Sequence, residues 1–155
     1  MQAKSTLQWF LVTLVISVLA LVGMLAIFPE LGLHDRLRFI SSGIYGKDAL
    51  DGPFSMVTQG FLFHFIITSI WTGSFFMLYP GFNFQQPNWI KTGVVFGLLV
   101  WGIMNFAVVP IAITKDFPKA LDFLGKSLAM HILFFGLPLA LIYIKYLYPK
   151  KLKIS

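Results

Sequence analysis

The chain has 155 residues, of which 57% are hydrophobic and only 12% charged, and its formal net charge is +6. Soluble domains carry about 25% charged residues, so this composition, with a mean hydropathy of +0.81, excludes an ordinary soluble domain and predicts a protein surrounded by the lipid bilayer. The absence of cysteine excludes disulfides and thiolate metal sites. The positive charges flank apolar runs instead of forming a soluble basic module, so we expect no nucleic-acid binding.

Four apolar runs are long enough to cross a bilayer as helices, which takes about 20 residues each. They cover residues 7–28, 54–79, 89–113 and 121–148. Backbone polar groups inside lipid must be satisfied within the chain, and the alternating pattern of a barrel strand is absent, so helices are expected. We therefore predict an all-α fold, a four-span transmembrane helix bundle that forms a single transmembrane domain over residues 1–155.

The first two spans are separated by the only sizeable predicted connection, residues 29–53. Leu33, Leu37 and Ile40 recur at helical spacing, so a short helix lying in the membrane interface is one interpretation of this segment. Glycines break the rest of it into turns. The other interpretation, which we favour from the sequence, is a plain outer loop without a partner.

The third span carries Gly93, Gly97, Trp101 and Asn105 at four-residue intervals on one face. A Gly-x-x-x-Gly pattern lets another helix backbone approach closely. We therefore predict that Gly93 and Gly97 are helix-packing positions. We also expect this face, together with the loop of residues 30–53, to contact another membrane subunit or a second copy of the chain.

The second and fourth spans share a pattern, in which a histidine is followed by aromatic residues and a closing Leu-Tyr-Pro. The pattern runs from His64 to Pro80 and again from His131 to Pro149. It suggests two parallel helical hairpins related as a repeat. Pro138 removes a backbone hydrogen bond from the fourth span and predicts a kink there.

Three polar residues are predicted to share one depth in the membrane. At about 1.5 Å per residue, His64, Asn105 and His131 each lie roughly 12 to 17 Å from the same face, near the middle of a core about 30 Å thick. Polar side chains at this depth turn toward the bundle interior, so we expect the three to approach one another. Thr68 and Trp101, one turn from His64 and Asn105, complete the candidate ligand-binding set.

Three functions are compatible with this polar set. In the first, the histidines hydrogen-bond Asn105 or nearby hydroxyls, and the protein is a non-enzymatic accessory or ligand-binding protein. In the second, His64 and His131 are axial ligands of a haem b iron in a redox protein. In the third, they line a pocket for a quinone-like ligand or a proton-linked path, as in an oligomeric small-solute transporter.

Enzymatic chemistry is not indicated. A catalytic zinc site needs three protein ligands, whereas the spans offer two deep histidines, no cysteine and no deep carboxylate. No serine has both a base and an orienting acid at membrane depth. We therefore expect a protein that is not an enzyme.

Four spans place both termini on one side of the membrane. The cations divide six against six between the two sides, so the positive-inside rule gives no preference. The lysine-rich tail, residues 149–155, suits an anionic cytoplasmic leaflet. We therefore predict that both termini are cytoplasmic.

Two segments, WGIMNFAVVP at residues 101–110 and AMHILFFGLP at residues 129–138, resemble small bacterial inner-membrane proteins of the YagU-like type. The resemblance covers mainly the second to fourth spans. It implies a bacterial inner-membrane location and about four spans. It implies no reaction, cofactor or functional residue.

Overall fold

A computed structural model describes residues 3–79, 88–112 and 121–147. Its α-helices and one short 3₁₀ helix are α1 (Ala3–Ile27), α2 (Leu33–Tyr45), the 3₁₀ helix Lys47–Ala49, α3 (Phe54–Leu78), α4 (Trp89–Ile103), α5 (Val109–Ala112), α6 (Leu121–Met130) and α7 (Leu137–Ile142). Three π-helical stretches join or extend them: Met104–Val108, His131–Gly136 and Tyr143–Leu147. The predicted residues 113 and 148, at the ends of two spans, lie outside the described residues.

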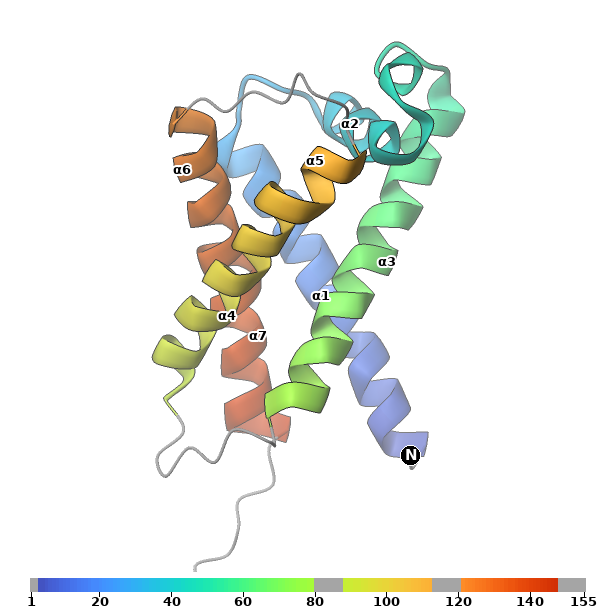
Figure 1. Cartoon of the computed structure of the whole chain (residues 1–155). Helices are drawn as coiled ribbons and strands as arrows, with labels where there is room; N and C mark the ends of the chain where they lie inside the picture. Colours follow the sequence, from blue (N-terminus) through green and yellow to red (C-terminus); the bar gives the residue numbers. More distant parts are fainter. Residues whose placement is uncertain (1–2, 80–87, 113–120, 148–155) are drawn as a thin grey trace, which may run out of the picture.

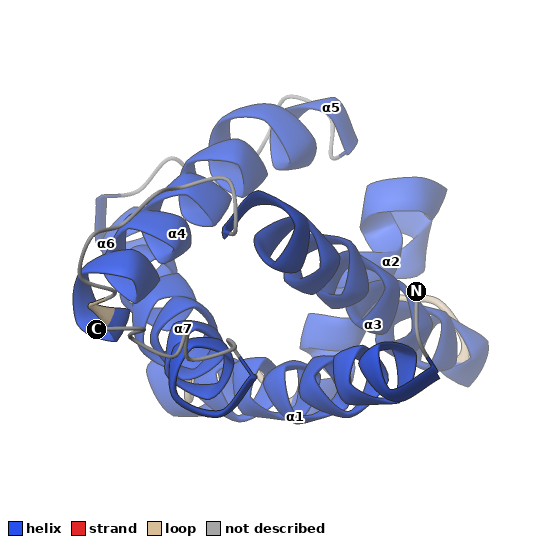
Figure 2. Cartoon of the chain, turned by 90° about the horizontal axis from the view of Figure 1, so that it is seen from below, coloured by secondary structure: helices blue, strands red, loops and turns tan. Residues whose placement is uncertain are grey.

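Four helical segments are long and apolar enough to cross a membrane, which confirms the predicted all-helical, four-span bundle. They are Thr6–Ile27, Phe54–Leu78, Trp89–Val108 and Leu121–Leu147, here called spans 1 to 4. The spans alternate in direction, so the start of α1 and the end of span 4 lie at the same end of the bundle (Figure 1). Seen from below, they stand side by side in the order α3, α1, span 4 and α4 (Figure 2).

The end of the bundle nearest the described chain ends is densely packed. Its core cluster consists of Val12, Ile16, Phe75, Tyr79, Phe96, Val100, Phe135, Leu139, Ala140 and Tyr143; we call this the packed half. The ring of Phe75 lies 4.8 Å from that of Phe96 and 5.4 Å from that of Tyr143. Each such aromatic pair contributes about 0.5–1.5 kcal/mol beyond its buried area, so aromatic contacts hold three spans together here.

The glycine face of α4 packs within the chain. A Cβ atom at Gly97 would lie 2.8 Å from the carbonyl oxygen of His131, and one at Gly93 would lie 2.7 Å from the Cα of Leu137. Gly136 faces them from span 4, where any Cβ would overlap the carbonyl of Gly93. Span 4 therefore covers Gly93 and Gly97 within the chain, and contact with another subunit stays a prediction.

Two prolines each follow a π-helical stretch by two residues. Pro110 in α5 comes after Met104–Val108, and Pro138 in α7 comes after His131–Gly136. A proline has no N–H to donate, and its ring clashes with the carbonyl four residues earlier. The N–H that follows each stretch instead bonds to a carbonyl five residues earlier. The distortion predicted at Pro138 thus takes the form of a π-helical stretch, which is frequent at functional sites.

The segment between spans 1 and 2 is not a plain loop, so that expectation is wrong. It forms the amphipathic helix α2, which packs against the start of α3 at the end of the bundle opposite the packed half (Figure 1). Gly60 permits this contact, since a Cβ there would overlap the carbonyl of Leu37. Ser41 adds a hydrogen bond of 2.5 Å from its hydroxyl to the carbonyl of Met56. α2 therefore closes the bundle at this end.

The predicted hairpin repeat has only partial support in local structure. Both histidines face the interior, one from α3 and one from span 4. However, α3 is a regular α-helix from end to end, whereas spans 3 and 4 contain the π-helical stretches. The repeat itself stays a prediction.

Candidate functional site: a cavity between the helices

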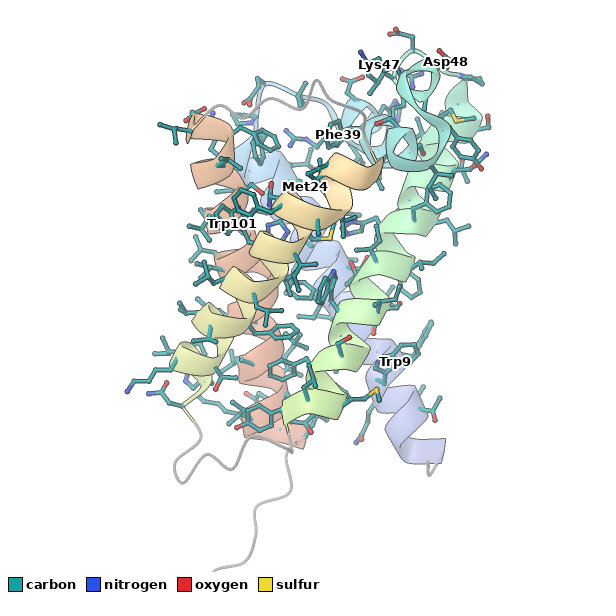
Figure 3. All side chains as sticks on the ribbon, in the orientation of Figure 1. Trp9, Met24, Phe39, Lys47, Asp48 and Trp101 are labelled. Carbon is teal, nitrogen blue, oxygen red and sulfur yellow. The ribbon has the colours of Figure 1, made fainter. Side chains whose placement is uncertain are left out.

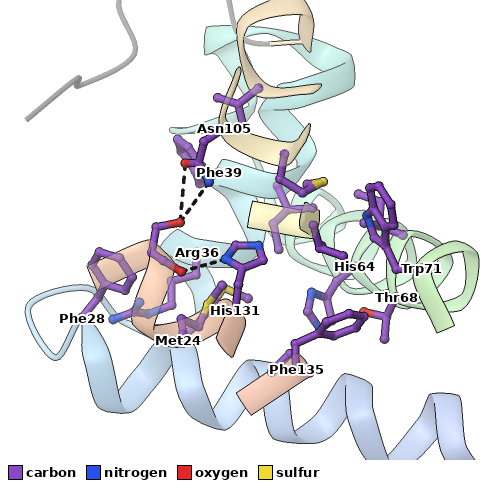
Figure 4. A pocket seen from close by; sticks show the side chains of 18 of the residues that line it. Met24, Phe28, Arg36, Phe39, His64, Thr68, Trp71, Asn105, His131 and Phe135 are labelled. Atoms are coloured by element: carbon purple, nitrogen blue, oxygen red, sulfur yellow. Dashed lines mark hydrogen bonds between the residues drawn. The ribbon is translucent and has the colours of Figure 1, made fainter. Parts of the chain in front are cut away.

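A cavity of about 450 Å³ lies inside the bundle, between α2 and the packed half (Figure 4). Most of its wall is aliphatic, aromatic or methionine side chains from α1, α2, α3 and spans 3 and 4. The polar or amphipathic members of the wall are Arg36, His64, Thr68, Trp71, Asn105, Ser127 and His131. Its size falls in the range of about 300–1,000 Å³ that is typical of small-molecule sites.

His64 contributes one ring nitrogen to the cavity wall. Its side chain is buried on α3, and its Nε2–H donates to the carbonyl oxygen of Ser17 on α1 at 3.1 Å. A carbonyl only accepts, so the proton of this bond belongs to the ring. In the uncharged imidazole, Nδ1 is then a hydrogen-bond acceptor. Thr68, one turn further along α3, lines the same cavity.

His131 is the first residue of the π-helical stretch in span 4. Its Nδ1–H donates to the carbonyl of Ser127 at 2.7 Å. Nε2 is therefore the acceptor nitrogen of the uncharged ring, and no described residue donates to it. The side chain projects into the cavity opposite α3 (Figure 4).

Asn105 is joined to the His131 region through Ser127. Its amide nitrogen donates to the Ser127 hydroxyl at 3.2 Å and to the carbonyl of Trp101 at 2.9 Å. Ser127 thus contacts Asn105 with its hydroxyl and His131 with its carbonyl. The structure brings all three predicted polar residues to one cavity, but among the described residues no hydrogen bond links His64 to the other two.

Trp101 does not line the cavity, although its carbonyl holds Asn105. Its indole ring packs edge-on against Phe106 at 5.4 Å. Trp71, on α3, lines the cavity in its place. Gly93 and Gly97 lie outside the cavity wall and position span 4 by close backbone contact.

The histidine pair, as arranged, does not fit a haem. Histidines that bind metals commonly donate their other N–H to a carbonyl, and His131 does so while leaving Nε2 available. His64 instead uses Nε2 in its bond to Ser17. Only Nδ1 remains, the nitrogen next to its own β-carbon, where a flat macrocycle would meet α3. Within the part of the chain that the structure describes, no cluster of three or more His, Cys, Asp or Glu residues forms a metal site either.

Arg36 is the polar wall residue that sequence reasoning missed. It is only 4% exposed, and its Nε and Nη2 groups both donate to the carbonyl of Leu31, at 3.0 and 2.7 Å. The guanidinium carbon lies 5.6 Å from the centre of the Phe28 ring. Burial lowers the pKa of Arg36, while the charges of Glu30 and Asp35 act to raise it. A guanidinium nevertheless stays charged in proteins, so the cavity has a permanent cation in its wall.

The signal for Arg36 was present in the sequence. Arg36 falls three residues after Leu33, one before Leu37 and four before Ile40, on the apolar stripe of the possible interfacial helix. A cation in the middle of an apolar stripe is either buried with a partner or a functional group.

Buried hydroxyl groups without a hydrogen-bond partner among the described residues line the contact between α1 and α3. The side-chain oxygens of Thr13, Ser17 and Thr72 are fully buried and make no hydrogen bond within the described residues. The buried Trp9 indole N–H, near the lower end of α1 in Figure 3, is likewise without an acceptor there. Trp9, Thr13 and Ser17 recur every four residues along α1 and lead from the packed half toward His64, and Thr72 lies on α3; we call these four positions the α1–α3 seam.

No family model, curated protein or solved structure matches this chain. The resemblance to YagU-like proteins therefore stays a prediction.

Proposed function

We propose that the protein is a non-enzymatic membrane protein that binds a small amphipathic molecule in its cavity. The observation that supports this is the cavity itself, about 450 Å³ in volume. Protein interiors are normally filled, and an empty space of this size destabilises the fold. Polar side chains at membrane depth are also costly unless they have a function.

The acceptor nitrogens suit a ligand with a polar group and an apolar body. His64 and His131 each use one N–H internally and offer the other nitrogen to the cavity. The remaining wall includes Met24, Ile67 and Met104, which would surround hydrocarbon. α3 and α4 both line the cavity, and they contact each other through Phe75 and Phe96 in the packed half.

The location we propose is a bacterial cytoplasmic membrane with both termini in the cytoplasm. Four helices long enough to span a membrane support a location in the lipid bilayer. The basic tail, which lies outside the described residues, and the YagU-like resemblance support the bacterial inner membrane and the orientation.

A cavity-filling substitution tests the binding function. Met104 lines the cavity, whereas Val95 on the same span is 65% exposed. We expect organic extracts of the purified wild-type protein and of Val95→Trp to contain one small molecule in near-stoichiometric amount, and extracts of Met104→Trp to lack it. Mass spectrometry identifies the molecule, and size-exclusion chromatography checks that both variants fold. Absence of a bound molecule from the wild-type protein, or its retention in Met104→Trp, would contradict the proposal.

The other functions predict different results. A haem b protein would show a sharp reduced-minus-oxidised visible spectrum that is lost in both His64→Ala and His131→Ala. A transporter would give solute flux in vesicles that depends on His64 and Asn105. An accessory protein with a membrane partner, or a homo-oligomer, would co-purify with that partner or as a larger assembly. Of these, the haem interpretation has the least structural support, because His64 Nε2 is already bonded.

A further inference from the structure

We propose that the cavity binds an anionic single-chain amphiphile, whose carboxylate or phosphate head is held by Arg36 at the α2 end. This inference rests on the proposed function and specifies the ligand class. It follows from three observations, namely the burial of Arg36, its missing counter-ion and its place in the bundle.

The charge of Arg36 is buried without a carboxylate partner. Among the described residues, no carboxylate lies within ion-pair distance of its guanidinium, and the two nearest acids face other cations. Asp35 lies 4.0 Å from Arg38, and Glu30 lies 3.9 Å from Lys126. A buried charge is costly unless it is paired. An anionic ligand would supply the missing pair.

Arg36 also has donors to spare. A guanidinium carries five N–H groups, and the bonds to Leu31 use one on Nε and one on Nη2. Both N–H groups of Nη1 and the second of Nη2 make no hydrogen bond to a described residue. Arginine is well suited to carboxylate and phosphate because its planar fork donates two parallel hydrogen bonds to their oxygens.

The position of Arg36 matches the orientation of an amphiphile in a bilayer. α2 lies at the outer end of the bundle, at the level where spans 1 and 4 have their outer ends (Figure 1). From there the cavity extends inward along apolar side chains toward His64 and His131 (Figure 4). A head at Arg36 would place the hydrocarbon chain inside the membrane. The cavity volume suits one chain of drug-like size, so a single-chain molecule is the better fit.

A purely structural role for Arg36 predicts a different outcome. In that case the guanidinium only donates hydrogen bonds to the carbonyl of Leu31, in the connection between α1 and α2, and its charge does not contribute to ligand binding. Arg36→Gln keeps an N–H donor near this position but removes the charge, whereas Arg36→Lys keeps the charge. Arg38→Gln is the matched control, because it removes the same charge from the same helix at a residue outside the cavity wall.

The experiment measures binding through Trp71, which lines the cavity. Delipidated protein in non-ionic detergent is titrated with a brominated long-chain fatty acid, with the alcohol of the same chain and with its alkyl phosphate. Bromine quenches indole fluorescence at short range, and Trp71→Phe shows which part of the signal comes from the cavity. We expect the wild-type protein and Arg38→Gln to bind the acid or the phosphate about 10- to 100-fold more tightly than the alcohol, the factor expected for a charged hydrogen bond.

Arg36→Gln should lose this preference and bind the alcohol as the wild-type protein does, while Arg36→Lys should retain part of it. Preference for the acid indicates a carboxylate ligand, and preference for the phosphate indicates a phosphorylated lipid; both support the inference. Equal binding of the acid, the phosphate and the alcohol by the wild-type protein, or an unchanged preference in Arg36→Gln, overturns it while leaving the binding function intact. If none of the probes quenches Trp71, the proposed binding function fails as well.

Discussion

The two ends of this bundle differ in how the space between the helices is filled. In the packed half, Phe75, Phe96 and Tyr143 fill the space between three spans with aromatic rings 4.8 to 5.4 Å apart. In the half closed by α2, the helices enclose about 450 Å³ and turn histidines and an arginine toward it. Both halves include residues of the same four spans. The difference therefore arises from where polar and bulky side chains fall, not from overall hydrophobicity.

The contrast suggests that one half of this small fold provides stability and the other half provides the binding site. The aromatic cluster and the glycine contacts between α4 and span 4 fix the helices relative to one another. The half closed by α2, here called the hollow half, can then hold polar groups around the cavity, because contacts in the packed half keep the helices together. Asn105 and His131 both lie in π-helical stretches, and such stretches are frequent at functional sites.

The largest expected effect comes from truncating the aromatic cluster. Phe75→Ala should lower the free energy of unfolding by about 3 kcal/mol, because Phe75 is 2% exposed and the space it leaves cannot close. Met104→Ala should cost clearly less, since it only enlarges an existing cavity. Unfolding in denaturing detergent, followed by circular dichroism, compares the two variants. Equal losses would contradict the division between the halves.

A smaller loss is expected from Gly97→Ala. Its Cβ would lie 2.8 Å from the carbonyl of His131 and 2.9 Å from the Cα of Ile132, so backbone must move. Overpacking of this kind costs about 1–3 kcal/mol. Gly102→Ala on the same helix is the control, because its Cβ would meet nothing within 4 Å. It should be neutral or stabilising by up to about 1 kcal/mol, and a similar loss in both variants would show that the contact is not tight.

The sequence was sufficient for the number of spans and for the shared depth of the polar residues. Bilayer thickness imposes the length of each apolar run, and helical rise converts sequence position into depth. These quantities depend on local sequence only. His64, Asn105 and His131 could therefore be placed near one level before any helix was packed.

Rotation about the helix axes was harder to predict. Four residues turn a helix by about 400°, so a face followed at four-residue steps drifts by about 40° per step. Gly93 and Gly97 contact span 4 directly, whereas the indole ring of Trp101, one step beyond Gly97, packs against Phe106. The position of α2 was not predictable either, because the close approach of Leu37 to Gly60 joins residues of separate elements.

Within the hollow half, Ser127→Ala tests the hydrogen bond to Asn105. Removing the hydroxyl should lower the free energy of unfolding by about 0.6 kcal/mol, the average for polar contacts between membrane helices. A double-mutant cycle with Asn105→Ala should give a coupling energy of the same size, because the amide donates to that hydroxyl at 3.2 Å. The His131 bond should persist, since it uses the Ser127 carbonyl. Additive losses would show that the two side chains do not interact.

The smallest effect is expected from the α1–α3 seam. Thr13 and Thr72 are fully buried, and their hydroxyls make no hydrogen bond to a described residue. Replacing an unsatisfied hydroxyl by a methyl group of the same shape is nearly neutral or stabilising. We therefore expect Thr13→Val and Thr72→Val to leave the midpoint of unfolding unchanged or slightly raised. A broken buried hydrogen bond costs about 1–3 kcal/mol. A loss of unfolding free energy of about 1 kcal/mol or more in either variant would therefore contradict this expectation. Such losses would mean that ordered water hydrogen-bonds to the hydroxyl groups of the seam. The contact of α1 with α3 would then resemble the hollow half, where polar groups have unused hydrogen-bonding capacity, more than the adjoining packed half.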